Sequence, residues 1–397
     1  MEPFRSPDLT DTIIYFSGHQ WLPGGNGRHD GLMEALAGHV RVIYAQPPKF
    51  SGALMEFPRP KIERARENFW LLHNAFGVRL SRVGRRLGRA GAIIDGAWLR
   101  QALSENGVST YAWWDSCPDP RTHWGIPPER LIYDCIDPCF VEAHQPEMGR
   151  AERISARKAR VVFATAETLL ERMKGFGANA HLLPNGCHEK DYHPSVLSGC
   201  ALPVPLQGRS GPVVGFMGTV DWRFDAQTVT AAATALPEFT FCIAGRVNAD
   251  QEARVAELRR LPNTIFPGGV SHEDGVAYTA HCDVAIIPFL PGPMGDAINP
   301  CKMYMYMMAG KPIVSTWTRE CARHAPYVMA ARTSEEFIAA IKAAVGDDSP
   351  ERRARRTQFA MQNRWEDRAD SAIQVLTQAG LFAPSRGAPT GAGYASA

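Results

Sequence analysis

A lysine at the start of a predicted helix is the feature of the sequence that most directly indicates chemistry. The segment INPCKMYMYMMAGKPIVST covers residues 298–316, and its Asn299 and Pro300 are typical of a helix start. Lys302 would lie in the first turn, and Gly310 can end the helix in a left-handed conformation. Free backbone N–H groups beside an ammonium group suit a diphosphate, so we expect a phosphate site here. Met303, Met307 and Met308 are expected to be buried in the core.

Two arginines follow predicted strands in the second half of the chain. Arg223 comes after the run 213–217, and Arg246 comes after the run 239–244. A guanidinium at either place could stabilise negative charge as it develops on a leaving group. Gly218, directly after the first of these strands, would let the backbone approach a ligand. The alternative for both arginines is an ordinary solvated position.

A glycine-rich loop, SGHQWLPGGNGRH, separates the first predicted strand from the first predicted helix at residues 17–29. It has no G-x-G-x-x-G pattern, so it does not predict a dinucleotide site. Gly18, His19, Gly25 and His29 are its candidates for contact with an acceptor or a phosphate. For His29 the alternative is a surface or capping role.

Carboxylates at the ends of two strands are candidate catalytic bases. Asp134 and Asp137 belong to LIYDCID, and Asp115 follows two tryptophans, of which Trp114 could line an acceptor pocket. A base needs hydrogen-bond reach and a suitable pKa. We favour Asp137, whose alternative role before Pro138 is a helix cap.

The elements that must position these residues alternate along the chain. Short, nearly continuous apolar runs are typical of strands buried on both faces of a parallel sheet, and helical patterns separate them. Ligands of such sheets bind outside the carboxyl ends of the strands. The runs are 12–16, 40–45, 130–134, 161–164, 213–217, 239–244, 284–288 and 312–316.

The composition of the chain changes at 184–212, where PNG precedes a stretch interrupted by Pro and Gly. This change predicts a domain boundary. The expected domains are an N-terminal acceptor domain at 1–190 and a C-terminal donor domain at 191–363. The helical pattern at 364–380 is expected to pack back on the first domain. Residues 383–397 are expected to form a disordered tail.

Composition sets the class. The chain has 397 residues, nine cysteines and a formal net charge of +2, which gives no field suited to nucleic acid. Scattered cysteines with no C-x-x-C pair predict reduced thiols and a cytoplasmic protein. The sequence has no run of about 18 apolar residues, so it predicts no membrane span. Dispersed histidines and the lack of a D-x-D pattern predict no metal site.

Five segments together resemble the retaining family 4 and family 1-like bacterial polysaccharide glycosyltransferases. They are the lysine segment at 298–316, LLPNGCHEKDYHP at 182–194, VVGFMGTVDWRFD at 213–225, FCIAGRV at 241–247 and the stretch 261–289. The resemblance covers most of residues 180–320 and is looser in the first half. It implies the GT-B fold, an α/β class in which two Rossmann-like, doubly wound parallel-sheet domains face a central cleft.

The resemblance also implies an activity. A sugar would move from a nucleoside diphosphate to a saccharide, lipid-linked or small-molecule acceptor, without a metal or a further cofactor. A UDP-sugar is the favoured donor and a GDP-sugar the alternative. In this family basic side chains and a helix N-terminus, here with Lys302 and Asn299, neutralise the diphosphate.

One departure concerns the ribose of the donor. The family has a glutamate where this chain has Met305, and a second glutamate where it has Ala297. Losing charge-assisted hydrogen bonds to the ribose costs about 1.5–3 kcal/mol unless another group substitutes. Three outcomes are open: another group holds the ribose, the donor lies differently, or no sugar nucleotide binds. The substitute candidates are Glu320, Asp296 and Tyr304.

Residues 59–100 carry ten Arg or Lys against three acids, and the stretch LSRVGRRLGRAGAII at 80–94 has its apolar residues on one side of a helical pattern. Such a segment suits an anionic membrane surface, and it equally suits an anionic acceptor or a solvated face. We therefore expect a cytoplasmic protein that can lie at the inner face of the membrane. The functional alternatives to a transferase are a silent GT-B binding subunit and another GT-B reaction such as sugar-nucleotide epimerisation.

Overall fold

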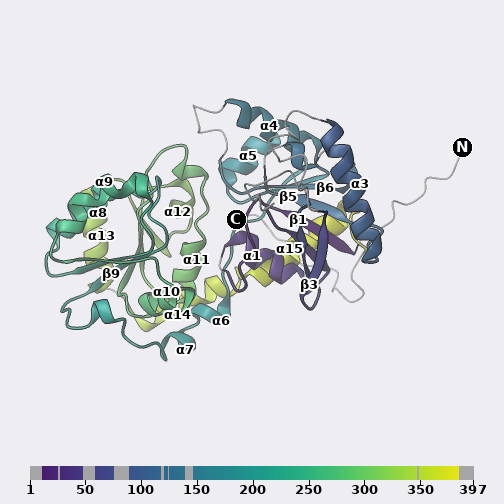
Figure 1. The fold of residues 1–397 in the computed structure, drawn as a ribbon. Helices are drawn as coiled ribbons and strands as arrows, with labels where there is room; N and C mark the ends of the chain where they lie inside the picture. The colour runs from purple at the N-terminus through teal and green to yellow at the C-terminus, as the bar shows by residue number, and fades with distance from the viewer. Residues whose placement is uncertain are drawn as a thin grey trace, which may run out of the picture.

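The computed structural model describes residues 11–25, 27–47, 59–75, 89–117, 120–123, 125–138, 146–346 and 348–383. They form two α/β domains that lie side by side (Figure 1). The tail predicted as disordered at 383–397 lies outside the described residues except for Ala383. Residues 76–88 of the basic segment lie outside them as well.

The first domain is built on an eight-stranded sheet with the order β3-β4-β2-β1-β5-β6-β7-β8. All neighbouring strands are parallel except β3, which pairs antiparallel with β4 at one edge. The strands are β1 (Thr12–Phe16), β2 (Arg41–Ala45), β3 (Lys61–Arg66), β4 (Phe69–His73), β5 (Ala112–Asp115), β6 (Leu131–Cys135), β7 (Val161–Ala164) and β8 (Ala180–Leu182). Its helices are α1 (Arg28–Leu36), α3 (Arg89–Glu105), α4 (Pro146–Lys158) and α5 (Glu167–Gly175), with short 3-10 turns at Pro120–His123 and Pro128–Arg130.

The second domain has six parallel strands in the order β11-β10-β9-β12-β13-β14. They are β9 (Val213–Met217), β10 (Thr240–Ala244), β11 (Thr264–Gly268), β12 (Val284–Ile287), β13 (Ile313–Thr316) and β14 (Val328–Ala331). Its helices are α8 (Ala226–Ala235), α9 (Glu252–Arg260), α10 (His272–Ala280), α11 (Cys301–Met308), α12 (Arg319–Arg323), α13 (Ser334–Gly346) and α14 (Pro350–Met361). The connecting segment holds α6 (Glu189–Tyr192) and α7 (Pro194–Leu197), and α15 (Trp365–Gln378) ends the described chain.

The eight apolar runs are all strands, within a residue or two of the predicted bounds. The β3–β4 hairpin was not predicted, since residues 59–100 were interpreted only as a basic segment with a helical pattern at 80–94. Its outer strand is mostly charged, with Ile62 and Ala65 between the charges, and lies at the edge of the sheet, where such side chains can reach solvent. Only α3, which starts at Arg89, is helical among the described residues of that basic segment.

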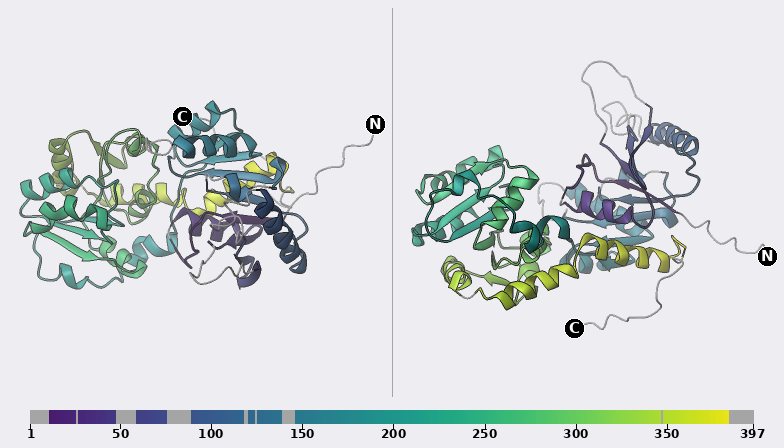
Figure 2. Two further views of the ribbon diagram at one scale, coloured as in Figure 1. Left: turned by 45° about the horizontal axis from the view of Figure 1, so that its top comes forward. Right: turned by 90° about the horizontal axis from the view of Figure 1, so that it is seen from below.

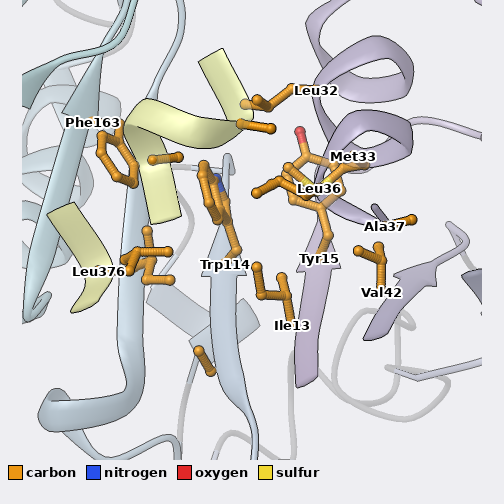
Figure 3. Close-up of a cluster of buried hydrophobic side chains, with 14 of the residues drawn as sticks. Ile13, Tyr15, Leu32, Met33, Leu36, Ala37, Val42, Trp114, Phe163 and Leu376 are labelled. Carbon is orange, nitrogen blue, oxygen red and sulfur yellow. The ribbon is translucent and has the colours of Figure 1, made fainter. Parts of the chain in front are cut away.

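The last helix completes the core of the first domain. Trp365, Ala369, Ala372 and Leu376 are fully buried with side chains of β1, β5 and α1, and Figure 3 shows Leu376 beside Trp114 and Phe163. Their spacing of three or four residues places them on one face of the helix. Figure 2 (right) shows α14 and α15 running from the second domain across to the first.

A buried ion pair joins the first helix to the sheet. Arg28, the first residue of α1, donates from Nε and Nη2 to both carboxylate oxygens of Asp134, at 2.9 and 2.7 Å. Its Nη1 also donates to the backbone oxygens of Leu183 and Pro184, at 2.9 and 3.3 Å. One guanidinium therefore ties α1, β6 and the start of the connecting segment together.

Two asparagines join the connecting segment to the second domain. The backbone N–H of Asn185 donates to Oδ1 of Asn299 at 2.9 Å, and its Nδ2 donates to the backbone oxygen of Asn299 at 2.6 Å. Both residues are buried. A second contact between the domains pairs Arg319 of α12 with Glu171 of α5 at 2.9 Å. The relative placement of the domains thus rests on specific polar contacts.

Arg28→Met should destabilise the first domain by about 3–5 kcal/mol, because it leaves the Asp134 carboxylate buried without its partner. Urea unfolding followed by tryptophan fluorescence would measure the loss. The double variant Arg28→Met/Asp134→Leu should recover a large part of it, and Arg64→Met, at an exposed position, should have little effect. A loss below about 1 kcal/mol for Arg28→Met would contradict this account.

Candidate active site between the two domains

Helix α11 carries the predicted lysine on the side of the second domain that faces the first (Figure 1). It begins at Cys301, with Pro300 before it, and ends before Gly310, whose φ of 68° is the left-handed conformation that the sequence predicted. The Lys302 ammonium lies over the rings of Phe216 and Phe289, with 4.7 and 5.0 Å between Nζ and the ring centroids.

Among the described residues, no carboxylate lies at hydrogen-bond distance from the Lys302 ammonium. Burial first, and then the charge of Arg223, lowers the pKa of Lys302 to about 8, while Asp221 opposes that change. A Cβ on Gly218 would lie 3.1 Å from Nζ, and the φ of 144° at this position favours glycine. Gly218 therefore leaves room for the ammonium at the end of β9.

The loop after β9 folds onto itself through an ion pair. Asp221 accepts hydrogen bonds from the backbone N–H of Arg223 at 3.0 Å, from Nε at 3.1 and 3.0 Å, and from Nη2 at 2.5 Å. The guanidinium also lies near the rings of Trp222 and Phe289, each 5.7 Å from its centroid. Leu290 N–H donates to the Arg223 backbone oxygen at 2.7 Å, which fixes this loop against the end of β12.

Asp137 approaches this loop from the first domain. Its side chain is accessible, yet surrounding protein raises the pKa of its carboxyl by desolvation. Arg223 opposes that rise, Asp221 adds to it, and His19 opposes it. We call these five residues, His19, Asp137, Asp221, Arg223 and Lys302, the interdomain cluster. It combines the Arg223 guanidinium and the Lys302 ammonium with two carboxylates, and desolvation raises the pKa of the Asp137 carboxyl.

Two histidines of the first-domain loop lie together, and one of them, His19, belongs to the cluster. His19 stacks on His29 with 4.6 Å between ring centroids, and His29 Nδ1 lies 2.6 Å from the hydroxyl of buried Tyr15. Burial, followed by the charges of His19 and Arg28, lowers the pKa of His29 to about 3. His29 is therefore neutral at physiological pH, so one of its ring nitrogens can donate a hydrogen bond and the other can accept one.

The structure corrects three candidates of the first domain. Asp134 is fully buried in its ion pair with Arg28, and Asp115 is fully buried, accepting from Cys117 N–H at 2.8 Å and from the Thr122 hydroxyl. Trp114 is fully buried in the core, stacked on Phe163 at 5.0 Å. Since no surface of the three reaches solvent, they maintain the fold and do not contact an acceptor.

The candidates for holding a ribose have protein partners. Glu320 is 2% exposed and accepts from Asn299 Nδ2 at 3.0 Å and from the backbone N–H of Glu167 at 3.1 Å. The Tyr304 hydroxyl accepts from the same amide at 3.2 Å, and Asp296 Oδ1 accepts from Arg319 N–H at 2.8 Å. Asn299 itself is engaged with Asn185. Glu320 and Asn299 therefore join the second domain to the first domain and the connecting segment, whereas Tyr304 and the Asp296 carboxylate bind groups within the second domain.

The other predicted residues lie apart from the cluster or border it. Met305 packs beside the apolar core under α11, and Arg246 is exposed after β10. Gly18 has a φ of 74° at the turn before His19, and a side chain on Gly25 would collide with Asp30. Sequence reasoning missed Asp221. Its spacing of two residues from Arg223 was the available signal, because such a pair can close on itself within a loop.

Comparisons with known proteins find relatives for part of the chain and solved structures for nearly all of it. Residues 211–347 match the family model described as Glycosyl transferases group 1. TuaH of Bacillus subtilis (strain 168), a glycosyltransferase assigned to teichuronic acid biosynthesis, is 26% identical over 243 residues, which are 56% of this chain and 60% of that protein. The 2-deoxystreptamine glucosyltransferase of Streptomyces kanamyceticus is 30% identical over 118 residues, 28% of this chain and 29% of that protein. The chain thus aligns with less than two thirds of the length of these relatives.

Solved structures match over nearly the whole chain. The sucrose-phosphate synthase of Thermosynechococcus elongatus has a TM-score of 0.66 at 14% identity and covers 92% of this chain and 98% of its own. The E. coli trehalose-6-phosphate structure bound with UDP-2-fluoro glucose gives 0.67 at 11%, covering 92% and 99%. Anabaena HepE in complex with UDP and glucose gives 0.64 at 14%, covering 93% and 100%. At these identities the likeness establishes the fold. The chain therefore has the GT-B fold of these structures, and its residues 211–347 match the group 1 glycosyltransferase model.

Proposed function

We propose that the protein transfers a sugar from a nucleoside diphosphate, with a UDP-sugar favoured over a GDP-sugar, to a saccharide, lipid-linked or small-molecule acceptor. The observation that carries the proposal is the Lys302 ammonium at the start of α11, beside Arg223 and the bare backbone of Gly218. Cations at this place would neutralise the departing diphosphate. Two of the similar structures contain UDP or a UDP-sugar, which supports this donor class.

The diphosphate, and not the ribose, would supply most of the donor's binding energy. The three substitutes for the family's ribose-binding glutamate already hydrogen-bond to protein groups, and Met305 offers only a weak acceptor. We therefore propose a donor held through its phosphates by Lys302 and Arg223, with the ribose contacted by groups other than a carboxylate.

Asp137 is the proposed base or acceptor contact. It stands on the first domain, opposite Arg223, its side chain is accessible, and desolvation by the surrounding protein raises the pKa of its carboxyl. A base needs such reach and a suitable pKa. His19 and His29 would line the same side of the acceptor position. The alternatives of a silent binding subunit and of an epimerase receive no support from a specific contact.

Lys302→Ala should weaken binding of UDP by at least tenfold, since it removes a cation from the proposed phosphate site. Thermal-shift measurements and calorimetry with UDP, GDP, ADP, CMP and TDP would identify the nucleotide and test the variant. Lys342→Ala, on α13, is the matched control and should bind like the wild type. No response of the wild type to any of these nucleotides at millimolar concentration would overturn the proposed function.

Asp137→Asn should slow the release of UDP from UDP-glucose, with water as acceptor, by about a hundredfold or more, because the amide cannot accept a proton. The affinity for UDP should not fall, since the change removes a negative charge near Arg223. A coupled assay for UDP measures the rate, and GDP-mannose would replace UDP-glucose if GDP is the nucleotide that binds. Unchanged turnover would exclude Asp137 as the base.

We also propose that the outer side of the first domain contacts an anionic membrane surface. Ile93 and Ile94 of α3 are 70% and 39% exposed, and the neighbouring strand β3 carries exposed Lys61 and Arg64. An apolar pair beside basic side chains suits anionic headgroups above acyl chains. No helix among the described residues has both the length and the apolar character needed to cross a membrane.

Ile93→Ser/Ile94→Ser should reduce sedimentation with vesicles of phosphatidylglycerol and phosphatidylcholine by about fivefold or more. Val204→Ser serves as the control, because Val204 is 76% exposed on the second domain. Wild-type protein that stays in the supernatant with these vesicles at low salt would refute membrane contact, and it would leave the proposed transfer reaction unaffected.

A further inference from the structure

Asp221 places a negative charge next to the two cations of the proposed diphosphate site. Both of its carboxylate oxygens accept hydrogen bonds from Arg223, and its charge acts on Lys302 to raise that residue's pKa against the effect of burial. The Asp221 side chain is 13% exposed, so little water separates it from its neighbours. A bound diphosphate would therefore meet two cations and one anion at close range.

The placement of Arg223 does not depend on Asp221 alone. Its backbone oxygen accepts from Leu290 N–H at 2.7 Å, and its guanidinium lies near the rings of Trp222 and Phe289. The loop is further joined to the end of β12 by Asp225 N–H, which donates to the Pro288 oxygen at 2.8 Å. These contacts hold the loop backbone and restrict the guanidinium, whose hydrogen bonds go to Asp221. The charge of Asp221 therefore adds an electrostatic effect to its hydrogen bonds, and the two can be separated by a variant that keeps an acceptor oxygen.

We propose that Asp221 is a positioning residue that moderates the hold of Arg223 and Lys302 on the diphosphate and thereby speeds release of the nucleoside diphosphate product. The proposal rests on the proposed function. Two uncompensated cations would bind the product as strongly as the charge that develops in the transition state, and such uniform binding does not raise turnover. An adjacent anion repels the fully formed diphosphate, and in the empty site it is the partner of Arg223.

Asp221→Asn removes the charge and keeps one oxygen that can accept from Arg223. At pH 6.5, below the pKa of about 8 of Lys302, calorimetry should show UDP binding at least fivefold tighter than in the wild type. Uridine, which has no phosphate, should bind both proteins alike. Asp221→Glu restores the charge and should return the affinity to the wild-type value.

The pH dependence separates this role from a structural one. The titratable groups that act on Lys302 are Arg223, Asp221, Cys301 and Cys321, and the rings of Phe216 and Phe289 cover its ammonium. Without the Asp221 charge the pKa of Lys302 falls, so the ammonium is lost at a lower pH. The advantage of Asp221→Asn for UDP should therefore shrink between pH 6.5 and pH 8.5. A loop that is merely distorted would bind UDP more weakly at every pH.

Glu257→Gln, which removes an equal charge from the exposed surface of α9, is the control and should leave UDP binding unchanged. Unchanged or weaker UDP binding by Asp221→Asn at pH 6.5, with a wild-type unfolding midpoint, would overturn the inference and leave the proposed function standing. A wild-type protein that binds no nucleoside diphosphate would overturn both. If GDP is the nucleotide that binds, GDP and guanosine replace UDP and uridine throughout.

Discussion

The Arg28 guanidinium is the interaction on which the geometry of the site depends. Its five donors reach a carboxylate of β6 and two backbone oxygens of the connecting segment, while its own backbone starts α1 directly after the histidine-bearing loop. A planar, permanently charged group can satisfy all of these acceptors at once, which an ammonium cannot. The loop with His19, the strand that leads to Asp137 and the joint at Asn185 are consequently fixed relative to one another.

Much of the fold followed from the sequence, because its signals are local. Continuous apolar runs marked the strands, and Asn-Pro and Gly310 marked the two ends of α11. Lys302 and Gly218 were predicted separately, and the structure brings them together because both lie beyond the carboxyl ends of neighbouring strands, where ligands of parallel sheets bind. The β3–β4 hairpin was missed because its mostly charged edge strand has no continuous apolar run.

The roles of individual carboxylates could not be read in the same way. Asp134 and Asp115 lie at or near the ends of strands, and Asp137 follows one. Only the fold decides that Arg28 neutralises the first, that the second accepts a hydrogen bond from Thr122 in the core, and that the third is accessible. Glu320 and Asn299 are equally ambiguous in sequence, because a buried amide network and a ligand site use the same residue types. The ion pair of Asp221 with Arg223 is known only from the structure, because it depends on how the loop after β9 folds.

The position of α15 has a consequence for the order in which the protein assembles. The ribosome releases all eight strands of the first sheet before residue 190, whereas the helix that covers one face of that sheet is encoded at 365–378. During the interval the buried faces of Tyr15, Trp114 and Phe163 lack the cover that α15 gives them in the finished chain. Maturation of the first domain therefore waits for the second to be synthesised, and the nascent chain presents an apolar surface to chaperones in the meantime.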